Sequence, residues 1–146
     1  MAQQAKTAVV ILNYNSADHT LRCVAALRAR SKAMPEVVVV DNASAAGDRE
    51  KLAPLAREGV RLLQSGKNLG FSGGMMLGAR LVEADYCLLL NNDCEFQNDV
   101  LTILQDFMQS HPEAALCGAA MLDESGKPRS SFNYFPTLGH ALFGYG

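Results

Sequence analysis

Metal-binding cysteine patterns, long apolar segments and a strong charge of one sign are all missing from this sequence. Its four cysteines and three histidines show no CxxC, HxxxH or Cys-His spacing, so neither a zinc site nor a disulfide framework is indicated. No apolar run approaches the roughly 18 residues of a membrane span, and no basic region precedes a long apolar one at the start. We therefore expect a protein of a reducing, cytoplasmic compartment without a transmembrane segment.

The charge pattern and the missing nucleotide motifs exclude further classes. The net charge is -2 and no Lys/Arg block occurs, whereas nucleic acids and anionic membranes are bound by clustered basic residues. We therefore expect the partner to be a small molecule and not a nucleic acid. The chain has no P-loop GxxxxGK[ST], no GxGxxG after its first apolar run and no GxSxG nucleophile motif, so neither a dinucleotide-binding Rossmann domain nor covalent catalysis is indicated.

The residues that are present alternate between two kinds of apolar pattern. Short apolar runs predict strands at 7–12, 36–41, 60–64, 86–90 and 115–122. Helical spacing and capping residues predict helices at about 16–30, 48–58, 74–83 and 99–110. Because parallel neighbours require a crossover, this alternation predicts an α/β fold with a mostly parallel sheet and helices on both faces.

The last part of the chain departs from this alternation. A turn signal at 126–128 is followed by a predicted edge strand at 131–135 and by an apolar, glycine-punctuated segment at 138–145. A finished domain seldom ends on so apolar a tail. We therefore expect residues 1–146 to be a single domain truncated at its C-terminal end, and such a tail to favour self-association into a homo-oligomer.

Polar residues follow three of the predicted strands, where ligands of parallel α/β sheets bind. The clusters are Asn13-Tyr14-Asn15, Asp41-Asn42 and Asn91-Asn92-Asp93. One carboxylate beside amide oxygens suits a hard cation such as Mg²⁺ or Mn²⁺, a tyrosine can stack on a nucleobase, and Asp41 can accept a hydrogen bond from a base or a sugar hydroxyl. Each cluster has a structural interpretation of about equal weight, because Asn and Asp are usual turn and capping residues.

The segment 66–74, GKNLGFSGG, offers a further anion site. A glycine-rich loop that feeds a helix N-terminus presents backbone N–H groups and a favourable dipole to a phosphate. A mobile connector is the alternative, yet the lysine and asparagine just before the helix favour ligand contact.

In combination these motifs closely resemble family 2 glycosyltransferases of the GT-A fold, and within them the rhamnosyltransferase-like branch. The motifs are VILNYN, VVDNAS, NLGFSGG and LLLNND, in that order, and the resemblance covers about 7–122. It implies a site for a nucleoside-diphosphate sugar, with Tyr14 against the base, Asp41 hydrogen-bonded to the base and Asp93 as ligand of a divalent cation. The implied donor-binding residues are Asn13, Tyr14, Asp41, Asn42, Asn68, Gly70, Gly73, Gly74, Asn91, Asn92 and Asp93.

The resemblance also implies the reaction, namely transfer of a sugar such as rhamnose to an acceptor hydroxyl with inversion and with help from the metal. A carbohydrate or lipid-linked acceptor, as in cell-surface polysaccharide synthesis, would bring the enzyme to the inner face of the membrane. Two departures from the family pattern matter. Asn91 replaces the first acid of the DxD-type motif, a variant that this branch tolerates, so that one carboxylate must bind the metal; no segment matches the family's general-base region, which stands against a complete enzyme. A nucleotide-sugar-binding module without turnover is therefore the alternative, and a sugar nucleotidyltransferase is third.

Overall fold

The structure is a computed structural model that describes residues 5–123 and 125–129. The chain divides into two compact units, Met1–Ala115 and Leu116–Gly146. The edge strand predicted at 131–135 and the apolar segment at 138–145 lie outside the described residues. Within the described ranges, no helix combines the length and apolar character that crossing a bilayer requires.

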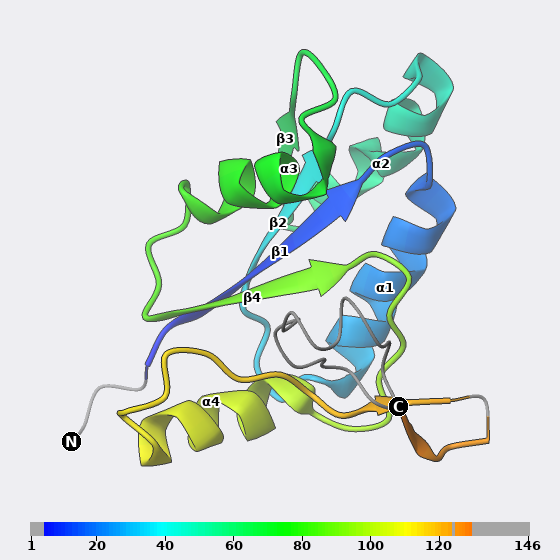
Figure 1. Ribbon diagram of the computed structural model, residues 1–146. Coiled ribbons are helices and arrows are strands. Elements are labelled where there is room, and N and C mark those ends of the chain that lie inside the picture. Colours follow the sequence, from blue (N-terminus) through cyan, green and yellow to red (C-terminus); the bar gives the residue numbers. More distant parts are fainter. Residues whose placement is uncertain (1–4, 124, 130–146) are drawn as a thin grey trace, which may run out of the picture. The chain divides into compact units, whose positions relative to one another are not determined.

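The first unit is built on a parallel four-stranded sheet (Figure 1). Its strands are β1 (Thr7–Asn13), β2 (Glu36–Asp41), β3 (Arg61–Gln64) and β4 (Tyr86–Asn91), in the order β3-β2-β1-β4. All three neighbouring pairs run parallel. The chain thus builds the sheet outward from β1 in one direction and then crosses to the other side of β1 for β4. The expected parallel α/β sheet is confirmed.

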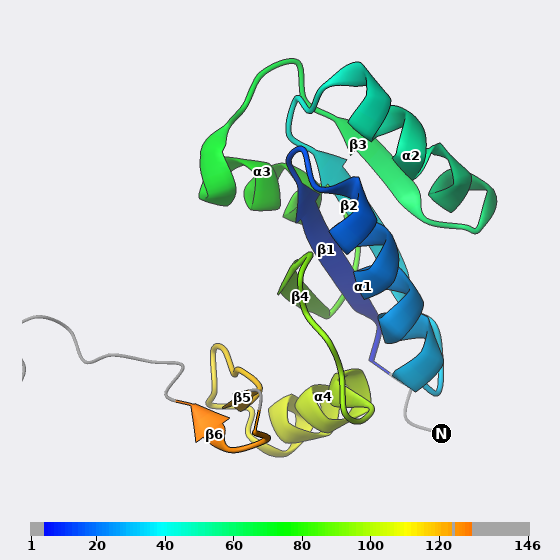
Figure 2. The same cartoon turned by 90° about the vertical axis from the view of Figure 1, so that its right-hand side faces the viewer.

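Helices cover both faces of this sheet, as Figure 2 shows with the sheet nearly edge-on. Helices α1 (Ala17–Arg30) and α2 (Ala46–Arg57) lie on one face, and α3 (Gly70–Ala79) lies on the other. Helix α4 (Val100–Ser110) follows β4, and its N-cap Asp99 accepts a hydrogen bond from the Thr102 N–H, as the capping pattern predicted.

The period-two alternation of the strands explains why the core has two parts. In β1, Val9 and Ile11 pack toward α1 and α2, whereas Val10 packs toward α3. The four valines of β2 divide in the same way and are at most 2% exposed. A strand that is buried on both faces needs a continuous apolar run, which is the pattern that the sequence shows.

Helix α3 begins at Gly70, inside the predicted loop, rather than at Gly74. Glycine is a poor helix former, but here its missing side chain is needed for packing. A Cβ atom on Gly74 would clash with the side chain of Leu12, and one on Gly78 would clash with Val10 and Val40. Burial of α3 against the sheet therefore outweighs the low helix propensity of this glycine-rich segment.

The strand predicted at 115–122 is wrong in extent and in burial. Only β5 (Met121–Leu122) forms there, exposed, and it pairs antiparallel with β6 (Pro128–Arg129) in a separate two-stranded sheet. The predicted turn explains this outcome, because the Asp123 carboxylate accepts hydrogen bonds from the N–H groups of Ser125 and Lys127 and so fixes a local hairpin. An apolar run by itself does not specify which neighbour it pairs with.

Candidate functional site

The register of the sheet brings the three polar clusters together at its carboxyl edge. Asn13 at the end of β1 pairs with Asp41 at the end of β2, and Leu12 pairs with Asn91 at the end of β4. Strands of a parallel sheet end at the same edge, so clusters that are far apart in sequence become neighbours. The sequence could predict that the three clusters meet, because this depends only on where the strands end.

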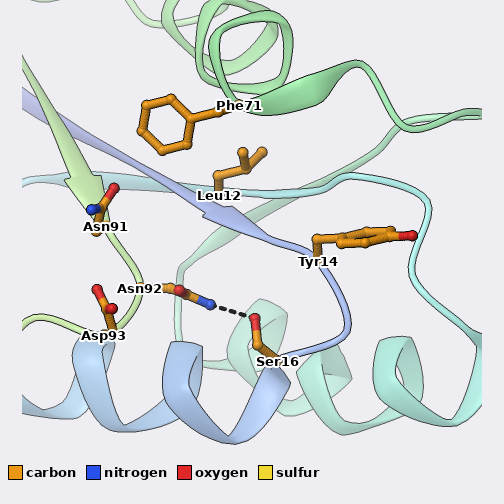
Figure 3. Close-up of a pocket in the computed structure, with 7 residues that line it drawn as sticks. All are labelled: Leu12, Tyr14, Ser16, Phe71, Asn91, Asn92 and Asp93. Atoms are coloured by element: carbon orange, nitrogen blue, oxygen red, sulfur yellow. Dashed lines mark hydrogen bonds between the residues drawn. The ribbon is translucent and has the colours of Figure 1, made fainter.

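A cleft of about 290 Å³ opens between the ends of β1 and β4 (Figure 3). It lies where the strand order reverses direction, which is the usual ligand position in open α/β sheets. Tyr14 stands on one side of the cleft, half exposed, and Phe71 from the start of α3 stands above Leu12. The residues that line the cleft are Leu12, Tyr14, Ser16, Phe71, Asn91, Asn92 and Asp93.

Asp41 is a buried carboxylate with one unused oxygen. Its side chain is 3% exposed, and its Oδ1 accepts a hydrogen bond from Asn13 Nδ2 at 3.2 Å. Its Oδ2 is buried without a hydrogen-bond partner among the described residues. A buried acceptor without a donor costs roughly 1 to 3 kcal/mol, and more when it is charged, so this oxygen is a candidate acceptor for a ligand donor.

Asn13, in contrast, is fully buried and engaged entirely by protein groups. Its Nδ2 also donates to Ser44 Oγ at 3.0 Å and to Asp48 Oδ2 at 2.9 Å, and its Oδ1 accepts from Thr20 Oγ1 at 2.8 Å. The structure therefore places Asn13 behind the site, where it orients other side chains.

Asn42 and Asn68 together hold the glycine-rich loop. Asn42 Nδ2 donates to Asn68 Oδ1 at 2.9 Å and to the Gly70 carbonyl at 3.2 Å, while Asn42 Oδ1 accepts from the Leu69 N–H at 2.9 Å. Asn68 Oδ1 also accepts from the Gly70 N–H at 2.8 Å. These bonds tie the end of β2 to the start of α3, and Gly70 itself requires a positive φ of 71°.

Two further glycines of the predicted set stand in helix α3. Gly74 is buried against Leu12, and a Cβ on Gly73 would come within 2.9 Å of Leu69 Cβ. Gly74 lets α3 lie close to β1, and Gly73 leaves room for Leu69 just before the helix, whose N-terminus borders the cleft at Phe71, where the helix dipole favours an anion.

The three residues of the Asn91-Asn92-Asp93 cluster differ in their surroundings: Asn92 is held by hydrogen bonds, whereas Asn91 and Asp93 are exposed. Asn92 Nδ2 donates to Ser16 Oγ at 2.7 Å (Figure 3). It also donates to Thr20 Oγ1 at 3.0 Å, and the two bonds tie the end of β4 to the start of α1. Asn91 and Asp93 are exposed and both line the cleft. The two exposed side chains of this cluster are thus one carboxylate and one amide.

This arrangement fits a metal ion only when other groups supply most of its ligands. In the part of the chain that the structure describes, no three His, Cys, Asp or Glu side chains are grouped to hold a metal ion. A hard divalent cation takes six or more oxygen ligands, so Asp93 and Asn91 suit a cation that shares its remaining positions with ligand phosphates and water.

Asp48 supports the site through its hydrogen bond from Asn13, a contact that the sequence pattern did not reveal. It stands in the first turn of α2, yet its Oδ1 accepts from the Ala17 N–H at 2.9 Å and so caps α1. Burial raises the pKa of this carboxyl, but hydrogen bonds from Asn13 and Ala17 and the charge of Lys51 outweigh burial and lower the pKa below its usual value. Ser16 and Thr20 were missed as well, although their spacing after Asn13 places both at the start of α1.

Cys23, in α1, contacts the end of β4. Its thiol donates to the Asn91 carbonyl at 3.5 Å, and it is buried. Burial first, and then the neighbouring Cys94 and Asp93, raise the pKa of this thiol to about 12. Since the thiolate is the nucleophile, Cys23 is a packing residue and not a reactive one.

Comparison with solved structures assigns the fold. A mannosyltransferase from Pyrobaculum calidifontis, PcManGT, solved with GDP-Man and Mn²⁺, superposes with a TM-score of 0.67 at 17% identity over 73% of this chain. Residues 1–349 of TarS from S. aureus, solved with UDP-GlcNAc, superpose with a TM-score of 0.63 at 20% identity over 73% of this chain. Both are GT-A glycosyltransferases, and this chain has the GT-A fold.

The sequence itself supplies the family. The sequence profile described as Glycosyl transferase family 2 matches residues 8–142, and the chain therefore belongs to this family. No curated protein sequence gives a significant match. The chain spans about a third of the length of the two solved structures, namely 33% of PcManGT and 32% of the TarS fragment.

Proposed function

We propose that this chain is the nucleotide-sugar-binding part of an inverting glycosyltransferase that transfers a sugar, rhamnose being the first candidate, to an acceptor hydroxyl. The observation that carries the proposal is Asp41, whose Oδ2 is buried without a partner among the described residues, at the carboxyl edge of a GT-A sheet. A nucleobase with a ring N–H, such as uracil, thymine or guanine, offers the donor that this oxygen lacks. Because Oδ2 is covered in this structure, its neighbours must shift when the base enters.

The cleft supports the rest of the donor. Tyr14 is half exposed at its side and is free to stack on the base, while the N-terminus of α3 borders it at Phe71. Asn91 and Asp93 would hold a Mg²⁺ or Mn²⁺ ion together with the diphosphate, and that cation supplies positive charge to the departing phosphate. Asn92 is held by Ser16 and Thr20 and keeps this strand end in place.

The general base is not assigned to a residue of the described chain. The carboxylate of Asp123 is engaged in the turn between β5 and β6, where hydrogen bonds from Ser125 and Lys127 lower its pKa. Its position in that turn supports a structural role instead.

A binding module without turnover is the second candidate. It is favoured by the lining of the cleft, where Asp93 is the single carboxylate among the lining residues that the structure describes. An inverting transfer requires a base for the acceptor proton in addition to a group that binds the cation. Hydrolysis of the donor separates the two candidates, since a module binds the nucleotide but leaves it intact.

The test is a binding and turnover panel. The protein is titrated with UDP-, dTDP- and GDP-sugars, with Mn²⁺ and with EDTA, by calorimetry, and slow donor hydrolysis is followed by chromatography. Binding of at least one donor, strengthened by Mn²⁺, is expected, and hydrolysis selects the enzyme over the module. The absence of nucleotide binding under both conditions would refute the donor site itself.

A further inference from the structure

The amide of Asn13 lies between the two ends of the proposed donor site. On one side its Nδ2, which carries two hydrogens, lies within hydrogen-bond distance of three acceptors that share them: Asp48 Oδ2 at 2.9 Å, Ser44 Oγ at 3.0 Å and Asp41 Oδ1 at 3.2 Å. Carboxylates accept and cannot donate when ionised, so these neighbours determine which end of the amide carries the nitrogen. The Asn13 backbone carbonyl also accepts from the Asn42 N–H at 2.8 Å, which fixes the end of β1 against the end of β2.

On its opposite side, the Asn13 amide is connected to β4 by hydrogen bonds. Its Oδ1 accepts from Thr20 Oγ1 at 2.8 Å, and the same hydroxyl accepts from Asn92 Nδ2 at 3.0 Å. Ser16 makes a parallel but weaker link, because it holds Asn92 at 2.7 Å yet lies 3.5 Å from Asn13 Oδ1. Thr20 is therefore the stronger connection between Asn92 and Asn13.

All donors in this series point in one direction. Asn92 donates to Thr20, Thr20 donates to Asn13, and Asn13 donates onward to Asp41. Asn13 and Thr20 are both 0% exposed, so the series runs through an interior of low dielectric, where hydrogen bonds in sequence polarise and strengthen one another.

We propose that Asn13 and Thr20 are positioning residues that couple the phosphate end of the site, at Asn92, to the base end, at Asp41. The series holds Oδ1 of Asp41 and leaves Oδ2 as the carboxylate oxygen without a partner among the described residues, the one that would accept from the nucleobase once its neighbours shift. This inference rests on the proposed function, which supplies the ligand, but it concerns residues that do not touch the ligand.

A base analogue distinguishes positioning from a purely structural role. Methylation of the ring N–H, as in N3-methyl-UDP or N1-methyl-GDP, removes the donor for Asp41 and leaves the diphosphate unchanged. The protein is expected to prefer the unmodified nucleotide. A variant that merely loosens the fold would weaken both ligands by the same factor, whereas a variant that releases Asp41 reduces the preference itself.

The main variant is Thr20→Val, which keeps the shape of the side chain and removes the hydroxyl. Affinities for UDP and GDP and for their N-methyl forms are measured by calorimetry with Mn²⁺. The preference for the unmodified nucleotide is expected to fall by about two- to tenfold, the effect of one lost neutral hydrogen bond. Ser16→Ala is expected to weaken both forms about equally, because Ser16 holds Asn92 but barely contacts Asn13.

Thr7→Val is the matched control. Thr7 Oγ1 also donates a hydrogen bond, to Gln105 Oε1 at 2.9 Å, but it lies at the amino end of β1, away from the cleft. This variant should leave the preference unchanged. An unaltered preference in Thr20→Val, or an equal loss in Thr7→Val, would overturn the coupling.

A measurement without ligand separates the failure of this inference from failure of the proposed function. Hydrogen exchange of the backbone is compared between the parent protein and Asn92→Ala. Faster exchange at 41–45 is expected, because loss of the Asn92 amide weakens the bonds that reach Asn13 and Asp41. If the parent binds no nucleotide, the donor site fails, and unchanged exchange at 41–45 would then refute the coupling independently.

Discussion

Asn13 Nδ2 donates to only one of the two carboxylate oxygens of Asp41, at 3.2 Å, and the other oxygen is buried without a partner in the part of the chain that is described. Buried polar atoms are nearly always paired, so the unpaired oxygen supports the proposal that Asp41 accepts a hydrogen bond from a ligand. The hydrogen bond thus joins Asn13, which strand pairing buries, to Asp41, the residue proposed to recognise the base.

The first prediction contrasts two carboxylates of the proposed site. Asp41→Asn should weaken nucleotide binding with and without Mn²⁺, by about 1.5 to 3 kcal/mol, because a hydrogen bond to a charged acceptor is lost. Asp93→Asn should remove the strengthening by Mn²⁺ and leave metal-free binding nearly unchanged. Calorimetry with UDP and GDP measures both effects.

The control for this pair is Asp18→Asn. Asp18 forms an exposed ion pair with Lys51 at 2.7 Å on the outside of α1, and its removal should not affect either form of binding. Identical affinities in all three variants and the parent would contradict the assignments of Asp41 and Asp93.

The second prediction concerns the glycines of α3. Gly78→Ala should lower the free energy of unfolding by about 1 to 2 kcal/mol, since overpacking against Val10 and Val40 exceeds the gain in helix propensity. Gly47→Ala in α2 should raise it by about 0.5 kcal/mol, because nothing lies within 4 Å of the added atom. Urea titration measures both, and stabilisation by both would show that α3 is not packed this closely on the sheet.

The third prediction is a pH dependence that arises from Asp48. Its pKa in the folded protein is lowered from the usual 3.8, so the unfolded chain binds the proton more readily. The stability that Asp48 contributes is therefore complete above about pH 4 to 5 and is lost as the pH falls through the folded pKa. In Asp48→Asn this acid-dependent part should be absent.

The measurement is urea unfolding at a series of pH values between about 7 and 3. The difference between Asp48→Asn and the parent should be largest at neutral pH and shrink in acid. Asp106→Asn, on the exposed surface of α4, is the control and should follow the parent throughout. A difference that grows as the pH falls would contradict the sign of the argument.

The fourth prediction is that Cys23 resists alkylation. With its pKa raised to about 12, the thiol is almost entirely protonated at pH 8. Iodoacetamide should modify Cys23 about a thousandfold more slowly in the native protein than in urea, where the pKa returns to about 8.5. Peptide mass spectrometry resolves the site, and rapid native labelling of Cys23 would show that α1 does not pack against the end of β4.

Much of the fold could be predicted from the sequence because it depends on local patterns. The continuous apolar runs of β1 and β2 can be buried only in a sheet covered on both faces, and the structure confirms this. The capping residue Asp99 and the apolar periodicity after it located α4. The run at 115–122 carried the same apolar signal and was misassigned, because burial of a strand also requires an available neighbour.

Local sequence patterns located the ends of β1, β2 and β4 to within one residue, the polar residues at these ends and the family to which they point. Which of these side chains are accessible could not be predicted in this way: Asp93 lines the cleft, whereas Asn13 is buried among its partners. The physical reason is that accessibility depends on register and on helix packing. The pairing of Asn13 with Asp41, and the cap that Asp48 lends to α1, join residues through contacts that no local sequence pattern encodes.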